Sequence, residues 1–304
     1  MTQIFLAGAV LVEHRRAWRF AGAPKRDTFF AMAESMASDG VARSELQWVM
    51  DRCSAEGAIT GFDPTGWEDS IWVLHAMYEH VDQSINATHD DVHQRLLERG
   101  DIEPLVVCDV NLEEGTTSTG VSLGMTSRPG PDWERLRWME LADRLSLTYG
   151  DEKWPPSSRW FPYRSWPATI EPPCEGSLDE KSLADLVAVL GAAERTDESP
   201  TCWVHNAHLM TGDFDKESVG REILARVPHR LYGDSDQKFS PTNFWPHDRS
   251  WFVYTDWDLS ATKVSGPNEL ISMLESHPTL ETIRWSTPTK GTALSRRFRS
   301  KFRG

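Results

Sequence analysis

Two aspartates near the C-terminal end of the chain are spaced in a way that suits metal or acid–base chemistry. Asp256 and Asp258 form a D-x-D pair at the end of the aromatic segment WFVYTDWD. Side chains alternate along a strand, so residues two apart share a face. Two carboxylates placed in this way can hold Mg²⁺ or Mn²⁺ beside a phosphate, or act as an acid/base pair. The preferred interpretation is structural, because D-x-D is short and common: Asp258 stabilises a turn, and Asp256 pairs with Arg249 or Lys263.

Aromatic and charged side chains surround this pair in sequence. The segment F-W-P-H-D-R precedes it, and a second group of tryptophans and arginines lies in a proline-rich stretch further upstream. Tryptophan beside arginine in loops is typical of protein interfaces, and also of pockets that stack aromatic rings. We take a protein-partner surface as the first interpretation and a ring-stacking pocket as the second. The candidate binding residues are Trp245, Asp248, Arg249, Asp256, Asp258, Trp160, Arg164 and Trp166.

Histidine spacing gives only a weak metal candidate. His89 and His93 are four residues apart on a predicted helix and therefore share a face, as zinc ligands do, but the nearby sequence lacks a third ligand. A solvated or cap-associated histidine pair is preferred. His75 and His80 are five residues apart, which does not match the H-E-x-x-H pattern of zinc peptidases. The four cysteines show no C-x-x-C spacing, so we expect neither a metal nor another cofactor.

Common nucleotide-binding signatures are missing from the sequence. It contains no G-x-x-x-x-G-K phosphate loop and no G-x-G-x-x-G dinucleotide fingerprint. P-loop and Rossmann chemistry are therefore disfavoured, and the sequence leans toward a protein that is not an enzyme.

The charge distribution bears on partners and location. The formal net charge of −14 argues against nucleic-acid binding by the body of the protein. The last 16 residues hold six basic side chains and no acid, so only this tail is a weak nucleic-acid candidate, although a solvated tail is preferred; its residues are Arg296, Arg297, Arg299, Lys301 and Arg303. Apolar runs are too short to span a membrane, no secretory pattern opens the chain, and unpaired cysteines suit a reducing compartment. We expect a cytoplasmic protein without a membrane partner.

Periodicity and capping residues predict a mainly helical first half. Helices are predicted over 27–38, 44–53, 67–81, 88–100 and 133–145, with a strand over 105–110 whose partner is 116–123. The clearest cap is the Thr88–Asp91 capping box, with Gly100 at the helix end. From Trp154 to Pro173, six prolines alternate with aromatic residues, which excludes a regular helix or a central strand and favours an ordered connector.

The second half predicts an α+β arrangement with an antiparallel sheet and helices on one face. A helix over 178–190 begins with a Ser177–Glu180 capping box and ends at Gly191; strands follow at 201–204, 250–256, 261–264 and 280–285, with a helix from Pro267 to Glu275. Residues 213–233 fit either a helix or strands. The predicted units are a basic N-terminal extension (1–26), a mainly helical domain (27–150), a Pro/Trp-rich connector (151–176), an α+β domain (177–288) and a basic tail (289–304).

Two segments carry a resemblance. Trp245–Asp258 together with Gly66–Glu79 resembles a group of actinobacterial proteins with a W-P-x-D-R-x-W-x-V-x-T-D-x-D signature. The resemblance implies a small α+β fold but no particular activity. Some relatives in that group look like immunity and binding proteins that travel with toxins.

The function expected from the sequence is therefore that of a non-catalytic cytoplasmic protein-interaction protein, of the immunity or defence kind, with Trp/Arg-rich loops on an acidic body. The alternative is an enzyme or small-molecule-binding protein with an acidic, divalent-metal site at Asp256 and Asp258.

Overall fold

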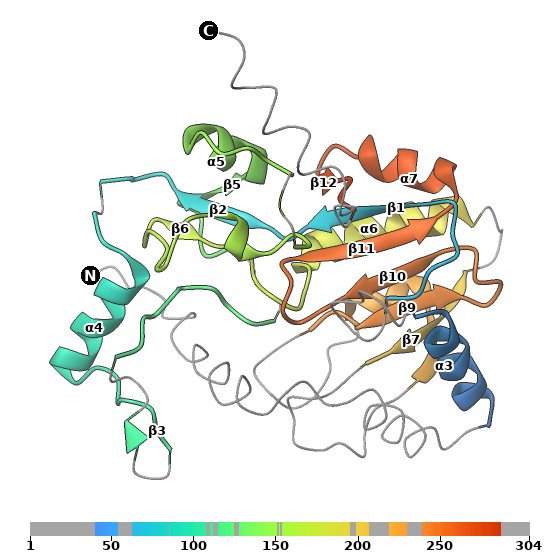
Figure 1. Ribbon diagram of the computed structural model, residues 1–304, viewed down its shortest axis with the longest axis horizontal. Coiled ribbons are helices and arrows are strands. Elements are labelled where there is room, and N and C mark those ends of the chain that lie inside the picture. The colour runs from blue at the N-terminus through green and yellow to red at the C-terminus, as the bar shows by residue number, and fades with distance from the viewer. Residues whose placement is uncertain are drawn as a thin grey trace, which may run out of the picture.

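The computed structural model describes residues 40–53, 63–84, 86–107, 110–111, 115–124, 128–150, 152, 154–194, 199–206, 219–229 and 239–286. The N-terminal extension, the helix predicted over 27–38 and the basic tail, including Arg296, Arg297, Arg299, Lys301 and Arg303, lie outside these residues. The described part is α+β (Figure 1).

A seven-stranded antiparallel sheet forms the larger lobe. Its strands are β1 (Asp69–Leu74), β7 (Thr201–His205), β8 (Val219–Ile223), β9 (Asn243–Pro246), β10 (Phe252–Thr255), β11 (Ala261–Gly266) and β12 (Thr282–Ile283), in the order β12-β1-β11-β10-β9-β7-β8. The short helix η3 (Leu224–His229) follows β8. β1 comes from the first half of the chain yet lies between β11 and β12, so segments on both sides of the predicted boundary near residue 150 share one sheet.

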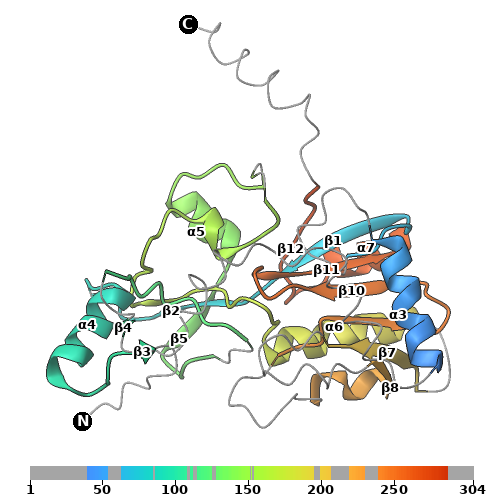
Figure 2. The ribbon, with the colours of Figure 1, turned by 60° about the horizontal axis from the view of Figure 1, so that its bottom comes forward.

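Helices cover both faces of this sheet. The helices α6 (Glu180–Ala193) and α7 (Asn268–Glu275) bury their apolar faces against Ile71, Val73 and Val264, among others. On the opposite face α3 (Gly40–Arg52) packs Leu46 and Val49 into a second core (Figure 2). Each such side chain contributes about 1.5–3 kcal/mol by leaving water. The sheet thus has helices on two faces, where the sequence predicts them on one.

A three-stranded antiparallel sheet forms the smaller lobe (residues 77–171). Its strands are β2 (Met77–His80), β5 (Trp133–Leu136) and β6 (Ile170–Glu171), in the order β5-β2-β6. This lobe also holds α4 (His89–Arg99), α5 (Trp138–Arg144), the short helix η1 (Ser158–Trp160), and a separate two-stranded hairpin of β3 (Val106–Val107) and β4 (Val110–Asn111) (Figure 1).

The helix predicted over 67–81 is wrong, because this segment forms β1 and β2. Its apolar residues fit helical spacing, but Ile71–Leu74 is a continuous apolar run, which is also typical of a strand buried on both faces. Ile71 and Val73 face α6 and α7, while Trp72 and Leu74 face the other core. This segment forms a strand because helices and core side chains pack against both faces of the sheet there.

Three smaller predictions also differ from the structure. The helix predicted over 133–145 begins at Trp138, after strand β5. The segment predicted as one strand over 105–110 instead contributes to two paired strands, with Val106 opposite Asn111 and Val107 opposite Val110, and Leu123 forms an isolated bridge with Glu175 instead of pairing with it. Asp179, not Ser177, caps α6 by accepting a hydrogen bond from the Ser182 N–H. α6 continues past Gly191 to Ala193.

Other predictions are confirmed where local chemistry is strong. Thr88 and Asp91 form the capping box of α4, and Gly100 ends that helix in the left-handed conformation. The strands predicted over 250–256 and 261–264 correspond to β10 and β11, which pair antiparallel with Phe252 opposite Ser265. The helix predicted over 44–53 corresponds to the C-terminal part of α3, and the described part of the proline-rich connector is ordered against the core.

Gly120 is a position at which a side chain cannot fit. Its φ is +82°, and a β-carbon there would overlap the His89 ring, which is held by a 2.9 Å hydrogen bond between Nε2 and the Ile170 carbonyl. We expect Gly120→Ala to lower the free energy of unfolding by about 2–5 kcal/mol, from left-handed strain plus overpacking. Gly115→Ala is the control, because φ is +75° but nothing lies within 4 Å. Urea denaturation measures both, and equal losses would contradict the expected overlap.

Candidate functional site

A row of polar side chains crosses one face of the seven-stranded sheet. The strand register pairs Trp72 with Lys263, Lys263 with Tyr254, Tyr254 with Asn243, and Asn243 with His205. Directly paired residues project from the same face, and this is the face on which α3 packs. All members except Lys263 are buried. Burying polar groups costs free energy unless they are paired. We therefore treat this row of buried polar side chains as a candidate site.

Most polar groups of the row have a partner. The Tyr254 hydroxyl donates to Asp256 Oδ2 at 2.8 Å, and Lys263 Nζ donates to both Asp63 oxygens at 3.0 and 2.9 Å. His205 Nδ1 and Asn243 Oδ1 are 3.0 Å apart. The sequence interpretation missed Asp63 and its pairing, although a lysine inside the otherwise buried strand ATKVSG signals that a carboxylate must lie nearby.

The titratable groups around Tyr254 have shifted pKa values. Burial raises the pKa of Asp256 to about 7. Burial also raises the pKa of Asp63, even though the Lys263 ammonium opposes it. The pKa of Tyr254 lies well above its usual value because of burial and the nearby carboxyls. A group of perturbed titratable residues is typical of functional sites, and Asp256 is able to hold or release a proton near neutral pH.

The structure uses Asp256 to build the β10–β11 turn. Its Oδ1 accepts a 2.8 Å hydrogen bond from the Asp258 N–H, while Oδ2 accepts from Tyr254. The sequence predicts that one aspartate stabilises a turn and the other pairs with a basic residue. In the structure Asp256, not Asp258, closes the turn, and Lys263 pairs with Asp63 instead of Asp256. Asp258 is exposed. Within the described residues, no group of three or more His, Cys, Asp and Glu side chains is placed to hold a metal ion.

The predicted site around this segment is divided between the two ends of β10. Asp248 and Arg249 precede the strand, whereas Asp256 and Asp258 follow it. The exposed Asp248 accepts a 3.0 Å hydrogen bond from the Ser250 N–H and shapes its own turn. Four strand residues span about 13 Å, so these side chains do not converge on one ligand.

Arg249 and Trp245 attach α3 to the sheet. Glu45 on α3 accepts hydrogen bonds from Arg249 Nη2 at 2.9 Å and from Trp245 Nε1 at 3.3 Å. The Arg249 guanidinium lies 4.4 Å from the centre of the Trp48 ring. Trp245 is fully buried and stacks on Phe252. Trp245 is thus a core residue of strand β9, not a surface loop residue, because α3 covers it.

The aromatic residues of the connector are also largely core. Trp160 and Trp166 are buried, whereas Arg164 is exposed. Trp160 Nε1 donates to the Trp154 carbonyl at 3.1 Å, and Trp166 packs on Tyr163. The predicted Trp160–Arg164–Trp166 surface is therefore corrected: prolines set the path, and two tryptophans point inward to fill the smaller lobe.

The histidines of α4 serve packing. His89 Nε2 lies 2.9 Å from the Ile170 carbonyl oxygen, and burial lowers the pKa of its imidazole. His93 is buried one turn further along the helix. Both therefore lie against the smaller lobe.

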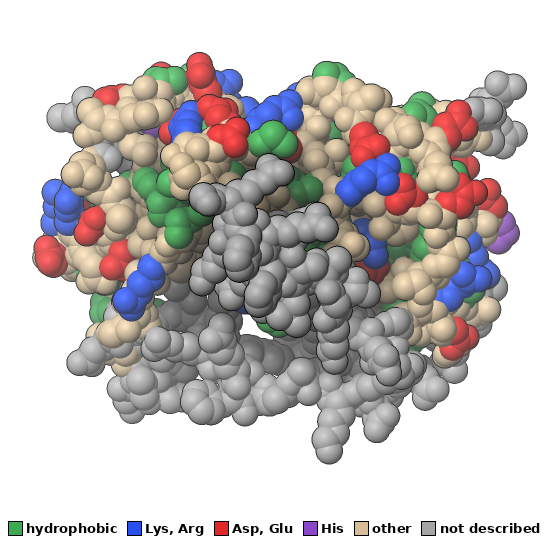
Figure 3. Space-filling view, turned by 45° about the horizontal axis from the view of Figure 1, so that its top comes forward, with side chains coloured by type: hydrophobic (Ala, Val, Ile, Leu, Met, Phe, Trp, Pro, Cys, Tyr) green, Lys and Arg blue, Asp and Glu red, His purple; other side chains and the backbone are tan. Residues whose placement is uncertain are grey.

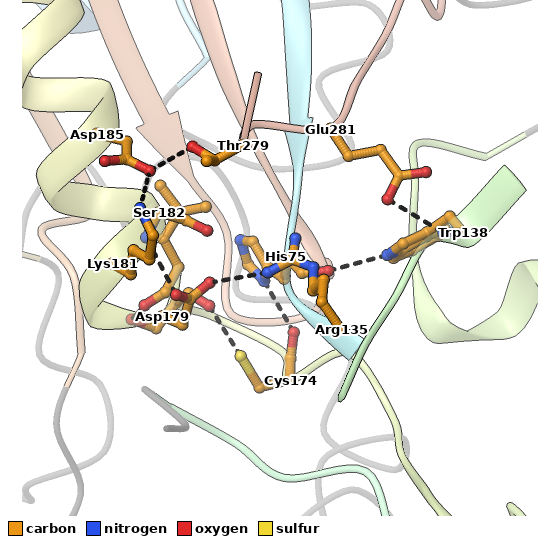
Figure 4. Close-up of polar contacts among 12 residues, drawn as sticks. His75, Arg135, Trp138, Cys174, Asp179, Lys181, Ser182, Asp185, Thr279 and Glu281 are labelled. Atoms are coloured by element: carbon orange, nitrogen blue, oxygen red, sulfur yellow. Dashed lines mark hydrogen bonds and ion pairs between the residues drawn. The ribbon is translucent and has the colours of Figure 1, made fainter. Parts of the chain in front are cut away.

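A buried hydrogen-bond chain that sequence reasoning missed runs through His75, between β1 and β2 (Figure 4). Nδ1 lies 2.8 Å from the Cys174 carbonyl oxygen, and Nε2 lies 3.2 Å from Thr262 Oγ1. A carbonyl only accepts, so Nδ1 carries the proton and Nε2 accepts from Thr262. Thr255 Oγ1 then donates to Thr262 Oγ1 at 2.9 Å. Burial lowers the pKa of His75 to about 4, so the ring is neutral at physiological pH.

Further polar contacts join the two lobes beside His75 (Figure 4). Trp138 Nε1 donates to the His75 carbonyl at 2.9 Å. The Glu281 carboxylate accepts from the Trp138 and Met139 N–H groups, both at 3.1 Å, and so caps the start of α5 from the other lobe. Arg135 lies 3.7 Å from Asp179. Contacts so distant in sequence leave no local signal.

The exposed large hydrophobic side chains of the described residues all belong to the smaller lobe. They are Val81, Leu105, Val106, Met139 and Trp154, with exposed fractions of 58%, 41%, 54%, 56% and 66%. Hydrophobic side chains are visible at the surface on the side of α5 in Figure 3. Helix α5, which carries Met139, and strand β3, which carries Val106, lie on different sides of the lobe (Figure 1), so these residues are separate candidate contact points for a partner.

Comparison of the chain with protein-family models, with curated proteins and with solved structures finds no match. Among the described helices, none combines the length and apolar character needed to cross a membrane.

The raised pKa of Asp256 gives a pH-dependent prediction. An unshifted aspartate titrates near 3.8 and the folded one near 7, so the folded state binds more protons between these values. The stabilisation from the protonated carboxyl is complete below about 3.8 and lost as pH rises through about 7. We expect Asp256→Asn to gain about 2–3 kcal/mol of unfolding free energy relative to the wild type between pH 5 and pH 8. Urea denaturation at both pH values measures this.

The exposed Asp132→Asn is the control for this measurement, because Asp132 lies in the smaller lobe, and its stability should follow the wild-type profile. Parallel profiles for the wild type and Asp256→Asn would show that Asp256 titrates normally. Glu171, whose pKa burial also raises to about 7, is present in all three proteins and cancels from the differences.

Proposed function

We propose that this protein is a non-catalytic cytoplasmic binding protein, of the immunity or defence kind, and that its smaller lobe meets a protein partner. The observation that carries the proposal is the position of the exposed hydrophobic side chains, which in the described residues all lie between Val81 and Trp154. Exposed Trp and Met side chains are enriched at protein–protein interfaces. The sequence interpretation placed the partner surface at Trp160, Trp166 and Trp245, which are buried; we now place it at these exposed residues instead.

The placement of three buried or half-buried acids supports a binding role over catalysis. Glu45 fixes α3, Glu281 caps α5 and Asp256 closes the β10–β11 turn. Each carboxylate thus has protein donors that hold an element in position. Such acids are satisfied as structural anchors.

A second candidate function is ligand or divalent-metal binding at Asp256 and Asp258. The raised pKa of Asp256 favours it, because catalytic acids are tuned toward neutrality. A titration with Mg²⁺ and with Mn²⁺, followed by calorimetry, tests this function directly. Equal heats for the wild type and for the Asp256→Asn/Asp258→Asn variant would exclude it.

The binding proposal predicts that polar replacements on the smaller lobe weaken a complex. The bait is the full-length protein, used to isolate a stoichiometric partner from native cells, and affinity is then measured with the purified partner. We expect Val81→Thr/Met139→Gln to weaken binding at least tenfold, because both changes remove exposed apolar contact while keeping side-chain size.

Ala188→Gln is the matched control, since Ala188 is exposed on α6 of the larger lobe. It should leave the affinity unchanged. Failure to recover any stoichiometric partner, or equal affinity of the double variant and the wild type, would refute a partner surface at these residues.

A further inference from the structure

The β3–β4 hairpin stands apart from both larger sheets. It pairs Val106 with Asn111 and Val107 with Val110, and no other described strand joins it. It lies on the α4 side of the molecule, away from the seven-stranded sheet (Figures 1 and 2). Val106 and Asn111 share a face and are both exposed, as is the preceding Leu105. An isolated hairpin of this size gains little stability from its own pairing, so its exposed apolar face calls for another explanation.

The sequence on either side of the hairpin is rich in acidic residues. Residues 82–114 carry nine acidic and two basic side chains, a formal charge of −7, which is half of the net charge of the whole chain. Glu98, Asp101 and Glu103 are exposed, and within the described residues no ion pair neutralises them. These three acids directly precede Leu105 in sequence. Apolar and acidic groups are therefore presented together.

The end of α4 fixes how this segment leaves the helix. Gly100 adopts φ 72°, and its N–H donates to the Leu97 carbonyl at 3.0 Å. The Asp101 N–H donates to the Leu96 carbonyl at 2.9 Å. These bonds are those of a Schellman-type helix end. The exposed acids therefore start from an ordered position, which lowers the entropy lost when a partner binds.

We propose that residues Glu98–Val106 form the docking element for a basic protein. The partner receives Leu105 and Val106 in an apolar pocket and places Lys or Arg side chains against Glu98, Asp101 and Glu103. This inference rests on the proposed binding function and names the partner's chemistry. Opposite charge speeds the encounter, and the apolar contact sets the lifetime of the complex.

The negative charge of this segment disfavours binding to nucleic acids and to anionic membranes. Nucleic acids and anionic membrane surfaces carry dense negative charge, which attracts basic segments and repels acidic ones. A protein with a basic surface is the class that satisfies both the apolar and the acidic groups of the hairpin.

The test measures association and dissociation rates with the partner isolated on the full-length bait. One variant is Leu105→Ser/Val106→Thr, and a second is Glu98→Gln/Asp101→Asn/Glu103→Gln. We expect the first to raise the dissociation rate at least tenfold. The second should slow association about tenfold at low ionic strength, with a smaller effect in 0.5 M salt because salt screens exposed charges. The partner itself should have a basic isoelectric point.

The matched control removes three exposed carboxylates elsewhere on the smaller lobe, in Asp132→Asn/Glu134→Gln/Asp143→Asn. It should change association less than threefold. Val106→Lys, a single exposed change in the strand, should also abolish tight binding by repelling a basic partner. Circular dichroism and thermal unfolding of each variant establish that the fold is intact.

The outcomes separate this inference from the broader proposal. If Val81→Thr/Met139→Gln weakens the complex while all hairpin variants bind normally, the docking element is wrong and the binding function stands. An acidic partner, or faster association after removal of the three hairpin acids, also overturns the inference. If no stoichiometric partner exists, both proposals fall.

Discussion

The passage of the chain from one sheet to the other at His75 and Ala76 is the constraint on which both lobes depend. β1 lies between two strands of the larger sheet, β2 lies between two strands of the smaller one, and only these two buried residues separate them. Because His75 is neutral and bonded to Cys174 and Thr262, the crossing has no charge to solvate. Rotation of one lobe against the other would break buried hydrogen bonds, so the lobes are set as one unit.

Buried and half-buried acids extend this arrangement outward. Glu45 holds α3, Asp63 holds Lys263 beside the polar row, and Glu281 holds α5. Removing one partner from such a pair is costly, because it leaves an uncompensated charge. The acidic side chains inside the protein therefore serve to hold helices and strands together. The exposed large hydrophobic side chains of the described residues lie on the smaller lobe, which is why we place recognition there.

The features that sequence predicts well are those whose causes are local. The Thr88 capping box and the β10–β11 hairpin depend on residues a few positions apart. The segment Ile71–Leu74 could not be assigned, since a short apolar run is the same in a buried helix and a buried strand until its neighbours are known. Trp245 looks like a loop residue because the partners that bury it, Glu45 and Trp48, are about 200 positions away.

The position of β1 has a consequence for how the protein is made. Leu74 leaves the ribosome long before its partner Ala261, with which it pairs in the finished sheet. At about 5–20 residues per second, the apolar strand waits on the order of 10–40 s for β11. During that time Ile71–Leu74 is an unpaired, aggregation-prone edge. Yield in a foreign host should therefore depend on translation speed and on chaperones that shield this strand, more than on the stability of the finished fold.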